Sequence, residues 1–379
     1  MSIQRQGNSC QKANLKGSHY SIMVPEIVTE IKRLAGGKGL ISIMEVCGTH
    51  TVAVYRSGLP NLLPSNLRLI AGPGCPVCVT SEEDLYAFCL LSRAKEVIVT
   101  TFGDLLRVPA SGTSLEKERV KGADVRLIYS PIDSLVIAKE NPDKKVVLLG
   151  IGFETTAAPI AATILEAERR RLKNFFLLSV IKTIPPVMAV LLDSDRVQVD
   201  GFLCPGHVST IIGAYPYEFI PKEYKKPAVI TGFEPEDILE GIVFILRQIR
   251  SGLPRVEIQY RRAVKPEGNR SAQSLISRVF QPCETSWRGL GKIPGTGLQI
   301  KKKFHRFDGW HKFEFPAGQK AKVRPACRCG EVIIGAISPE ECKLFRSRCN
   351  PERPMGPCMV SGEGTCSTHY KYQLESGTL

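Results

Sequence analysis

The C-terminal region carries an unusual concentration of thiols. Six of the chain's 13 cysteines lie within 40 residues there: Cys327, Cys329, Cys342, Cys349, Cys358 and Cys366. A [4Fe–4S] cluster or a structural zinc ion needs about four thiolates, so two thiols remain that would form a redox pair. Because His369 is the one histidine close to these cysteines, the composition favours an iron–sulfur cluster over a mixed His/Cys zinc site.

The segment GPGCPVCVT holds a second thiol motif. Cys75 and Cys78 form a C-x-x-C spacing inside a turn rich in glycine and proline. This spacing is typical both of a dithiol that cycles with a disulfide and of two ligands to one metal ion. No second C-x-x-C occurs in the sequence to complete a zinc ribbon, so we favour the redox interpretation over structural zinc.

Cys47, in the motif EVCGTHT, follows an apolar segment and precedes a predicted helix. The dipole of that helix is expected to lower the pKa of Cys47 and to favour the thiolate, which is the metal-binding and nucleophilic form. The alternative is a buried structural thiol. His50 lies in the same motif and could tune the thiol or accept its proton, or be merely hydrogen-bonded.

Two other motifs place polar residues at predicted helix starts. GFETT contributes Glu154 and Thr155, which we predict to act in the site, with helix capping as the alternative role. CPGHVST contributes His207, three residues after Cys204. A Cys–His nucleophile for acyl transfer would use such a pair, but the sequence shows no oxyanion-hole or third-residue signature for it.

Apolar, β-rich segments alternate with amphipathic ones from about residue 39 to residue 250, which is the pattern of βαβ units around a parallel sheet. The predicted strands are GLISIMEV, LRLIA, EVIVTT, VRLIY, KVVLLGI, FFLLSVI, VDGFL and PAVIT. One predicted helix follows Ser81 as its cap, and others cover Thr155–Arg171 and Pro235–Arg250. We therefore predict an α/β fold with two doubly wound, Rossmann-like parallel-sheet domains and a break near Gly122.

The predicted domains are residues 20–122, residues 123–252, and a basic C-terminal region at residues 253–379 that holds a small, irregular iron–sulfur module. Beyond Leu253 the sequence changes to glycine, proline and scattered aromatic residues with weak periodicity. Such a segment needs another source of order, and metal binding can supply it because binding free energy becomes folding free energy.

The polar motifs all begin where a predicted strand ends. EVCGTHT, GPGCPVCVT, TTFGDLLRVPAS, GFETT, CPGHVST and TGFEP share this placement. In a parallel sheet these strand ends lie along one edge, where ligands bind and helix N-termini present free N–H groups. We expect the six loops to converge on one or two clefts.

With 379 residues, 43% of them apolar, the chain has room for two or three modest globular domains. Its longest apolar runs are far shorter than the ~20 residues that cross a bilayer, and the N-terminus lacks the apolar region of a signal peptide. We therefore expect a cytoplasmic protein without a membrane segment. In that compartment so many cysteines indicate metal binding or redox chemistry rather than a disulfide framework.

The net charge of +14 is concentrated in the C-terminal third, where residues 251–379 hold 22 Lys and Arg against 11 Asp and Glu. Lys301, Lys302 and Lys303 form the one compact basic run, which we interpret as a solvated loop rather than a phosphate-binding site. An anionic cofactor or an acidic partner protein would suit this charge equally well. We expect no nucleic-acid partner, because no aromatic-and-basic RNA motif and no zinc-finger spacing is present.

Taken together, the motifs resemble the HypD family of hydrogenase maturation factors. EVCGTHT, GPGCPVCVT, GFETT, PGHVS and the tail CRCGEVIIGAISPEECKLFRSRCNPERPMGPCMVSGEGTC are similar to that family in order, spacing and identity. TFGDLLRVP, TGFEP, YRRAVKPEGN and WRGLG resemble its intervening sequence. The resemblance covers residues 25–372.

The resemblance implies a scaffold that assembles the iron–dicyano–carbonyl group, Fe(CN)2CO, of [NiFe]-hydrogenases. It implies two Rossmann-like domains, a small domain with a [4Fe–4S] cluster, a small HypC-type chaperone as partner, and a HypE-type partner that donates cyanide. It makes Cys47 the iron-binding thiol, and Cys75 and Cys78 the dithiol of the cleft. The implied cluster ligands are Cys327, Cys342, Cys349 and Cys366, with Cys329 and Cys358 as a second dithiol.

Two other functions compete with this one. A free-standing iron–sulfur thiol/disulfide reductase, resembling ferredoxin–thioredoxin reductase, would share the cluster and the dithiol. It gives no role to Cys47 or to six loops along one crevice. A basic zinc-binding nucleic-acid module is favoured only by the charge and the cysteine count.

Overall fold

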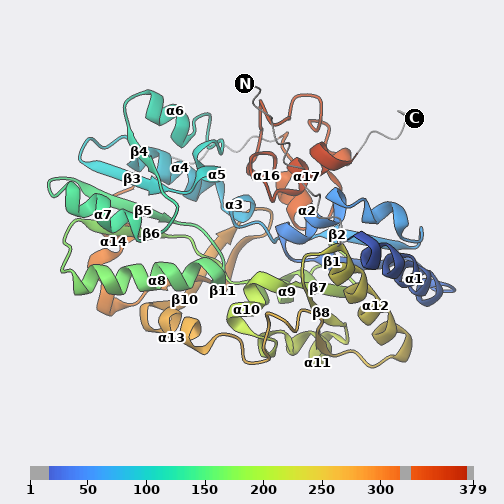
Figure 1. Ribbon diagram of the computed structural model, residues 1–379. Coiled ribbons are helices and arrows are strands. Elements are labelled where there is room, and N and C mark those ends of the chain that lie inside the picture. Colours follow the sequence, from blue (N-terminus) through green and yellow to red (C-terminus); the bar gives the residue numbers. More distant parts are fainter. Residues whose placement is uncertain (1–16, 316–325, 374–379) are drawn as a thin grey trace, which may run out of the picture.

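The computed structural model describes residues 17–315 and 326–373 and shows an α/β molecule built around two parallel β-sheets (Figure 1). One sheet has five strands and the other has four, and the eight strands predicted from the sequence are present as β1 to β8. The predicted α/β fold with two parallel-sheet domains is therefore confirmed. The iron–sulfur cluster stays a prediction.

The five-stranded sheet combines the first two strands of the chain with three later ones. Its order is β2 (Leu67–Ala71), β1 (Ile41–Glu45), β7 (Gly201–Pro205), β8 (Ala228–Thr231) and β9 (Val256–Ile258), all parallel. One face packs against α1 (Gly17–Ala35), α2 (Gly48–Arg56) and α12 (Pro235–Ser251). The other packs against α9 (Ile184–Leu192), α10 (Gly206–Ile212), α11 (Phe219–Tyr224) and C-terminal residues.

Alternate residues of each strand supply the two cores of this sheet. Ile43 and Leu203 are buried under α1 and α12, whereas Met44 and Phe202 are buried on the opposite face. This is the two-residue period of a strand whose two faces are both covered. It explains why the sequence of these strands is almost continuously apolar.

The four-stranded sheet is also covered on both faces. Its order is β4 (Asp124–Leu127), β3 (Val97–Thr101), β5 (Lys145–Gly150) and β6 (Phe175–Ser179), all parallel. One core contains residues of α7 (Asp133–Glu140), α8 (Glu154–Arg169) and α13 (Arg270–Val279). The other contains residues of α4 (Glu82–Leu91), α5 (Gly103–Leu106), α6 (Leu115–Val120) and α14 (Gly309–Lys312).

The strands do not follow the predicted division at Gly122. Ile98 of β3 pairs with Asp124 of β4, so strands on both sides of that glycine belong to one sheet. In the sequence, all four strands of the four-stranded sheet lie between β2 and β7, which both belong to the five-stranded sheet. The predicted boundaries are therefore wrong for the two sheets. Every βα unit has the same local pattern, and only tertiary packing decides which strands become neighbours.

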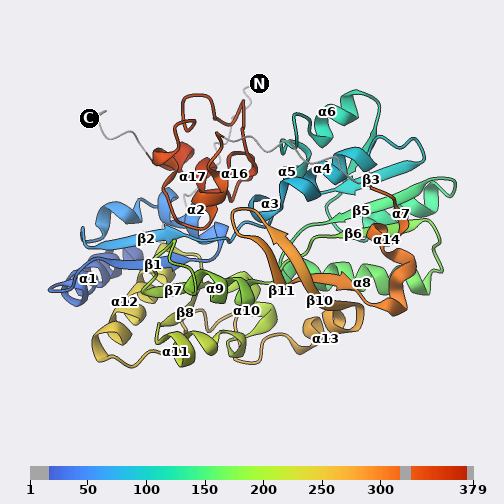
Figure 2. The same cartoon turned by 180° about the vertical axis from the view of Figure 1, so that it is seen from behind.

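The segment after β9 is more regular than its weak periodicity indicated. It contains α13 and an antiparallel hairpin of β10 (Phe280–Trp287) and β11 (Gly291–Ile300). The register shifts between Cys283 and Thr285, and this irregularity interrupts the alternation that marks a strand in a sequence. The hairpin lies between the two sheets in Figures 1 and 2.

The chain ends in a small unit of short helices, residues 327–373, which we call the C-terminal module. Its helices are α15 (Cys329–Ile333), η4 (Pro339–Glu341), α16 (Pro357–Val360) and α17 (Thr365–Tyr372). Other short helices are η1 (Leu59–Leu62), α3 (Pro76–Val79), η2 (Tyr215–Tyr217) and η3 (Lys302–Phe307). The module packs on α2 and on α3, and α3 lies on the segment that leads from β2 of one sheet toward β3 of the other.

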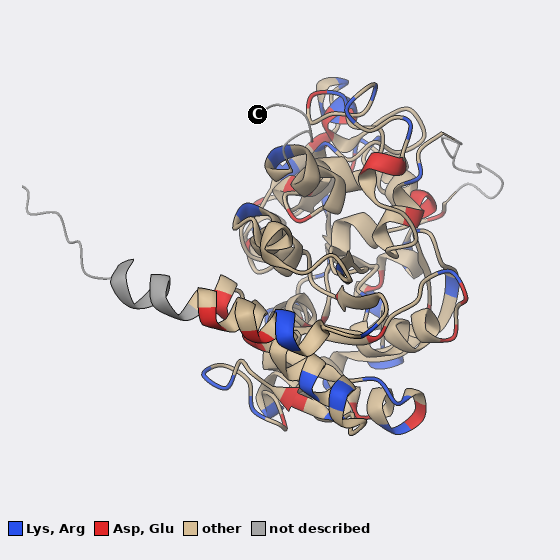
Figure 3. Ribbon diagram, turned by 90° about the vertical axis from the view of Figure 1, so that its right-hand side faces the viewer, with Lys and Arg blue, Asp and Glu red and all other residues tan. Residues whose placement is uncertain are grey.

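The charged residues are distributed over many elements. Figure 3 shows Lys and Arg interleaved with Asp and Glu on the side that it presents. The basic run begins η3, and its Lys302 and Lys303 are exposed, in agreement with a solvated segment. None of the described helices combines the length and the hydropathy needed to cross a membrane.

Candidate functional site

Four loops that follow strands of both sheets line one cleft. They come after β1, β2, β5 and β7. The cleft has a volume of about 330 Å³ and is lined by Val46, Cys47, Thr49, Gly74, Pro76, Phe153, Thr155, Thr156, Pro205, His207, Val208, Thr210 and Glu363. We call it the Cys47 cleft. The motifs EVCGTHT, GPGCPVC, GFETT and CPGHVST therefore converge, as expected from their positions at strand ends.

Cys47 is the N-cap residue of α2 and its side chain is buried. Burial and the nearby Glu363 carboxylate raise the pKa of the Cys47 thiol to about 11. The backbone N–H groups of His50 and Thr49 favour the thiolate but are outweighed. The expected lowering of this pKa is therefore wrong for the chain by itself. Burial destabilises the thiolate more than the N–H groups at the start of α2 stabilise it.

Cys75 and Cys78 form a disulfide across the short helix α3. Both side chains are buried, and the Cys78 N–H donates a hydrogen bond to Cys75 Sγ at 3.2 Å. A disulfide at this position agrees with the interpretation of the C-x-x-C motif as a dithiol–disulfide couple. Whether the pair cycles during function stays a prediction.

The turn before the disulfide lies directly on Cys47. The Gly48 N–H donates a hydrogen bond to the Gly74 carbonyl at 3.1 Å. A β-carbon on Gly74 would lie 2.3 Å from the Cα of Cys47, a distance that no side chain tolerates. Glycine at position 74 therefore allows the close approach of the two backbones, which keeps the loop that carries the disulfide against the Cys47 loop.

His50 is fully buried and links the Cys47 loop to the TGFEP loop after β8. Its Nε2 lies 2.9 Å from the Gly232 carbonyl and 3.2 Å from Thr231 Oγ1. Because a carbonyl only accepts, Nε2 carries the proton, and Nδ1 has no partner among the described residues. Burial lowers the pKa of His50 to about 4, so the ring is neutral at physiological pH.

The remaining two predicted loops reach the site through other contacts. His207 begins α10, is exposed, and stacks on Phe233 of the TGFEP loop with ring centroids 4.0 Å apart. The loop after β3 contributes Asp104, which accepts a hydrogen bond from Ser361 of the C-terminal module at 3.0 Å. All six motif loops therefore lie at or beside the Cys47 cleft.

Glu154 and Thr155 begin α8 but point to different surroundings. Glu154 Oε1 accepts a hydrogen bond from the Ile184 N–H at 2.9 Å, and its Oε2 has no partner in the described part of the chain. Burial raises the pKa of Glu154 to about 7. Thr155 lines the cleft. Neither residue is the cap of this helix, because the N-cap position is Phe153.

Glu363, to which the sequence gave no obvious role, enters the cleft from the C-terminal module. Thr49 Oγ1 donates a hydrogen bond to Glu363 Oε1 at 2.7 Å. The residue lies on the loop between α16 and α17, which carry Cys358 and Cys366. Its only signal in the sequence was the segment SGEGT between two cysteines. It gives the cleft a negative charge next to Cys47.

The six C-terminal cysteines line one small pocket inside the C-terminal module. Cys327, Cys329, Cys342, Cys349, Cys358 and Cys366 line it together with Val332, Leu344, Phe345, Gly356 and Met359. All six are free thiols. Among the described residues, no three His, Cys, Asp or Glu side chains are grouped as a ready-made site for a metal ion. The donor set, six thiols in an apolar pocket, fits the ligands of an iron–sulfur cluster.

Cys358 occupies a central position among these thiols. It lies within hydrogen-bonding reach of the Cys329 and Cys366 thiols, and its Sγ also accepts a hydrogen bond from the Cys366 N–H at 3.2 Å. Cys329 is in similar contact with Cys327. The contact between Cys329 and Cys358 is the one that the predicted second dithiol needs.

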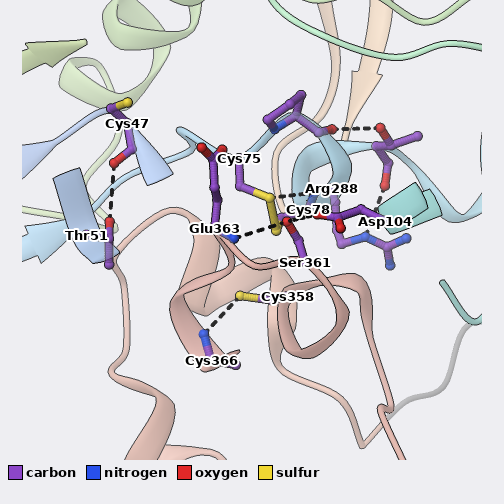
Figure 4. The surroundings of a disulfide bond; sticks show 12 residues. Cys47, Thr51, Cys75, Cys78, Asp104, Arg288, Cys358, Ser361, Glu363 and Cys366 are labelled. Carbon is purple, nitrogen blue, oxygen red and sulfur yellow. Dashed lines mark hydrogen bonds between the residues drawn. A yellow bond between two sulfur atoms is a disulfide. The ribbon is translucent and has the colours of Figure 1, made fainter. Parts of the chain in front are cut away.

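The C-terminal module packs directly on the two helices of the cleft. Its α15 and α16 contact α3, and its α17 contacts α2. Arg288 of the WRGLG segment binds the C-terminal end of α3. Its backbone N–H donates to the Val79 carbonyl at 2.9 Å, and its Nε donates to the Thr80 carbonyl at 3.1 Å. Figure 4 shows the disulfide between the Cys47 loop and the ribbon that carries Cys358.

Cys204 does not form a nucleophilic pair with His207. It is fully buried within β7, and burial raises the pKa of its thiol. His207 is exposed and stacked on Phe233 instead. The arrangement gives no support to Cys–His acyl transfer.

Comparisons with known proteins show the family of the chain. The HypD sequence profile, described as the hydrogenase formation hypA family, matches residues 23–373. The chain is 46% identical over 337 residues to the hydrogenase expression/formation protein HupD of Azotobacter chroococcum mcd 1, covering 87% of this chain and 89% of that protein. It is 43% identical over 338 residues to the hydrogenase maturation factor HypD of Escherichia coli (strain K12), covering 88% and 90%. It is 40% identical over 351 residues to a putative hydrogenase expression/formation protein of Methanocaldococcus jannaschii, covering 93% and 97%. The chain therefore belongs to the HypD family of hydrogenase maturation factors.

Proposed function

We propose that this protein is the scaffold on which the Fe(CN)2CO group of a [NiFe]-hydrogenase is assembled. The observation that carries the proposal is the packing of three thiol-bearing segments against one another. Cys47 lies in the cleft, the Cys75–Cys78 disulfide lies beside it, and the six-cysteine pocket lies in the adjoining module. The first can hold iron, and the other two can carry out redox chemistry. Membership of a family of hydrogenase maturation factors supports the same role.

Cys47 is the residue that we propose to hold the cargo iron. Low-spin iron with cyanide and carbonyl ligands suits soft thiolate ligation. Binding must displace the thiol proton, so cationic iron opposes the effects of burial and Glu363 on the pKa of Cys47. Among the described residues that line the cleft, Cys47 is the one cysteine. A HypC-type chaperone would supply a second thiolate.

The residues around Cys47 have distinct proposed roles. His50 acts on the thiolate through its backbone N–H, while its ring fixes the loop. Thr155 and His207 line the same cleft and offer hydrogen bonds to polar cargo ligands such as cyanide. Glu154 is proposed to position the start of α8 through its bond to the Ile184 N–H.

The C-terminal module is proposed to hold a [4Fe–4S] cluster. The proposed ligands are Cys327, Cys342, Cys349 and Cys366, whose thiols are gathered in one apolar pocket. A bound cluster would supply one-electron transfer. Cys329 and Cys358 are then left as a dithiol in mutual contact. The choice of four ligands among six follows the family resemblance rather than a difference in exposure.

The Cys75–Cys78 disulfide is proposed to cycle. Its reduction breaks one S–S bond and takes up two electrons and two protons to give two thiols. The Cys329/Cys358 dithiol would deliver both by thiol–disulfide exchange and become a disulfide itself. Thiol counting on unfolded protein should therefore give two more thiols after reduction than before it, and this difference should vanish in Cys75→Ser. An unchanged count in the wild-type protein would contradict the redox role and revive structural zinc.

The partners and the compartment follow from the same chemistry. A HypE-type protein is proposed to deliver cyanide to the cleft, and a HypC-type chaperone to share the iron. We place the reaction in the cytoplasm, because the described cysteines other than Cys75 and Cys78 are free thiols, a state that a reducing compartment maintains.

The second candidate function is an iron–sulfur thiol/disulfide reductase without a scaffold role. The presence of a disulfide next to a module with six thiols favours it. It does not require the close contact of Gly74 with Cys47, nor a cleft in which Glu363 and His207 surround a lone thiol.

Infrared spectroscopy separates these two functions. The protein should be co-purified anaerobically with its HypC-type chaperone from cells that express the other maturation proteins. The scaffold predicts stretching bands of metal-bound cyanide and carbonyl in this complex, and none in the chaperone purified alone. A complex that turns over disulfides but shows no such bands would establish the reductase instead.

A further inference from the structure

β2 is an edge strand of the five-stranded sheet, and a groove of about 340 Å³ runs along it. All five residues of the strand, Leu67–Ala71, line this groove. Pro60 and Leu63 also line the groove, as do Ile337 and Pro339 of the C-terminal module. Figure 2 shows β2 at the border of its sheet, on the side of α17. We call this space the β2 groove.

The hydrogen bonds at the two ends of β2 show which way its backbone faces. The Ile41 N–H donates to the Asn66 carbonyl at 2.8 Å, just before the strand. The Gly72 N–H donates to the Glu45 carbonyl at 2.8 Å, just after it. The even-numbered residues of this segment therefore turn their backbone groups toward β1, because backbone direction alternates with a period of two.

The same alternation turns the odd-numbered residues of β2 toward the groove. Leu67 uses its N–H in a bond to the Pro64 carbonyl at 2.9 Å. Leu69 lies in the middle of the strand, and in the described part of the chain its N–H and carbonyl have no partner beyond the sheet. The groove therefore contains the N–H and the carbonyl of Leu69, which are spaced as an added strand would need them.

Two side chains of the β2 groove define the chemistry of an occupant. The side chain of Arg68 is exposed and forms no hydrogen bond or ion pair within the residues that the structure covers. Leu40, at the end of the groove near the start of the strand, is 62% exposed. Glu340, which follows the groove residue Pro339 in the chain, is already bonded to His369 Nδ1 at 2.9 Å. A matching ligand would bring a carboxylate for Arg68 and an apolar group for Leu40.

We propose that an extended segment of a partner protein adds to the sheet alongside β2 and pairs an acidic side chain with Arg68. An extended peptide offers the N–H and the carbonyl that complement Leu69, together with alternating side chains for the groove. Five strand residues span roughly 16 Å, which suits a short linear segment. The proposal rests on the proposed function only in that an assembly scaffold has protein partners to hold.

The β2 groove lies close to the Cys47 cleft along the chain. β2 leads directly into the turn that contains Gly74 and Cys75, so a partner held on β2 lies next to the Cys47 cleft. The groove is closed at the same end by the C-terminal module, where a β-carbon on Gly335 would lie 3.0 Å from the Ala71 carbonyl. One docking segment would therefore contact both the five-stranded sheet and the C-terminal module.

Selection from a peptide library tests the proposal. Random displayed heptapeptides are selected on the immobilised, anaerobically purified full chain, with counter-selection on its Leu69→Pro variant. We expect enriched sequences that carry Asp or Glu between alternating apolar residues. Fluorescence anisotropy with the best peptide should show binding at least about tenfold weaker to Leu69→Pro and to Arg68→Glu. Arg56→Glu, an exposed arginine outside the groove, should bind as the wild type does.

The variants distinguish loss of the docking edge from loss of the fold. Leu69→Pro removes an N–H that faces away from β1, whereas Ile70→Pro removes one that faces it. Hydrogen exchange of the β1 amides should therefore stay slow in Leu69→Pro and become fast in Ile70→Pro. Arg68→Glu changes no backbone group, so its effect on binding does not depend on this check.

Three results would overturn the proposal. The first is equal peptide affinity in the wild type, Leu69→Pro and Arg68→Glu. The second is full displacement of the peptide by glutarate, which would show a small-acid site. The third is a wild-type dimer by light scattering that Leu69→Pro converts to monomer, which would make a second copy the occupant. Peptide binding with the expected pattern in a protein that lacks the infrared bands would refute the scaffold and keep the docking site.

Discussion

Replacing Cys47 by alanine is expected to abolish the cyanide and carbonyl stretching bands of the co-purified complex and to block hydrogenase maturation. The cargo iron would lose its ligand from this chain, and no other cysteine lines the cleft within the described residues. The fold should survive, because the thiol makes no side-chain cap to α2 and alanine removes a single sulfur atom. Visible absorption from the C-terminal module should also persist.

Cys283→Ala is the matched control for this experiment. Cys283 is a half-buried free thiol on β10 that lies outside the Cys47 cleft. Its replacement should leave the infrared bands at full strength. Bands that survive unchanged in Cys47→Ala would show that another group holds the iron, and the assignment of this thiol would be wrong.

Serine at any of four C-terminal cysteines is expected to remove most of the visible absorption and about four irons per chain. These positions are Cys327, Cys342, Cys349 and Cys366. A hydroxyl is a poor substitute for a thiolate as a ligand of iron–sulfur clusters. Iron content and the charge-transfer absorption of anaerobically purified protein measure the effect. A colourless wild-type protein that contains zinc would refute the cluster altogether.

Cys329→Ser and Cys358→Ser are the controls within the same pocket. Both thiols line it, and Cys358 contacts Cys366, so the two variants change the surroundings of the proposed cluster as much as the others do. They should keep most of the iron and the absorption while losing the second dithiol. Loss of the absorption in either of them, or its retention in all four ligand variants, would refute the proposed partition.

The sequence by itself determined the elements and the motifs of this protein. Largely apolar segments predicted eight of the nine parallel strands, because strands covered on both faces need apolar residues at most positions, and the three-residue strand β9 was missed. Ser81 predicted the start of α4, where its hydroxyl accepts a hydrogen bond from the Asp84 N–H. The placement of the motifs after strand ends was enough to expect that Cys47, Cys75 and the other loops would meet.

The strand partners could not be read from the sequence. The loop at Gly122 looks like a domain boundary, yet β3 and β4 pair across it, and β1 pairs instead with β7. Local sequence encodes where a strand begins and ends, whereas the choice of its neighbour depends on long-range burial that all similar βα units could satisfy. The regular hairpin of β10 and β11 was hidden for a related reason, since its register shift breaks the two-residue pattern.

Only the tertiary structure decided the electrostatics of the site. A helix start favours a thiolate, but the structure buries Cys47 and brings Glu363 beside it from a position 316 residues later in the chain, so its pKa rises. The His50 ring, close to Cys47 in sequence, faces the Gly232 carbonyl instead. Burial and charge depend on everything that packs around a group, and a motif specifies only the residues next to it.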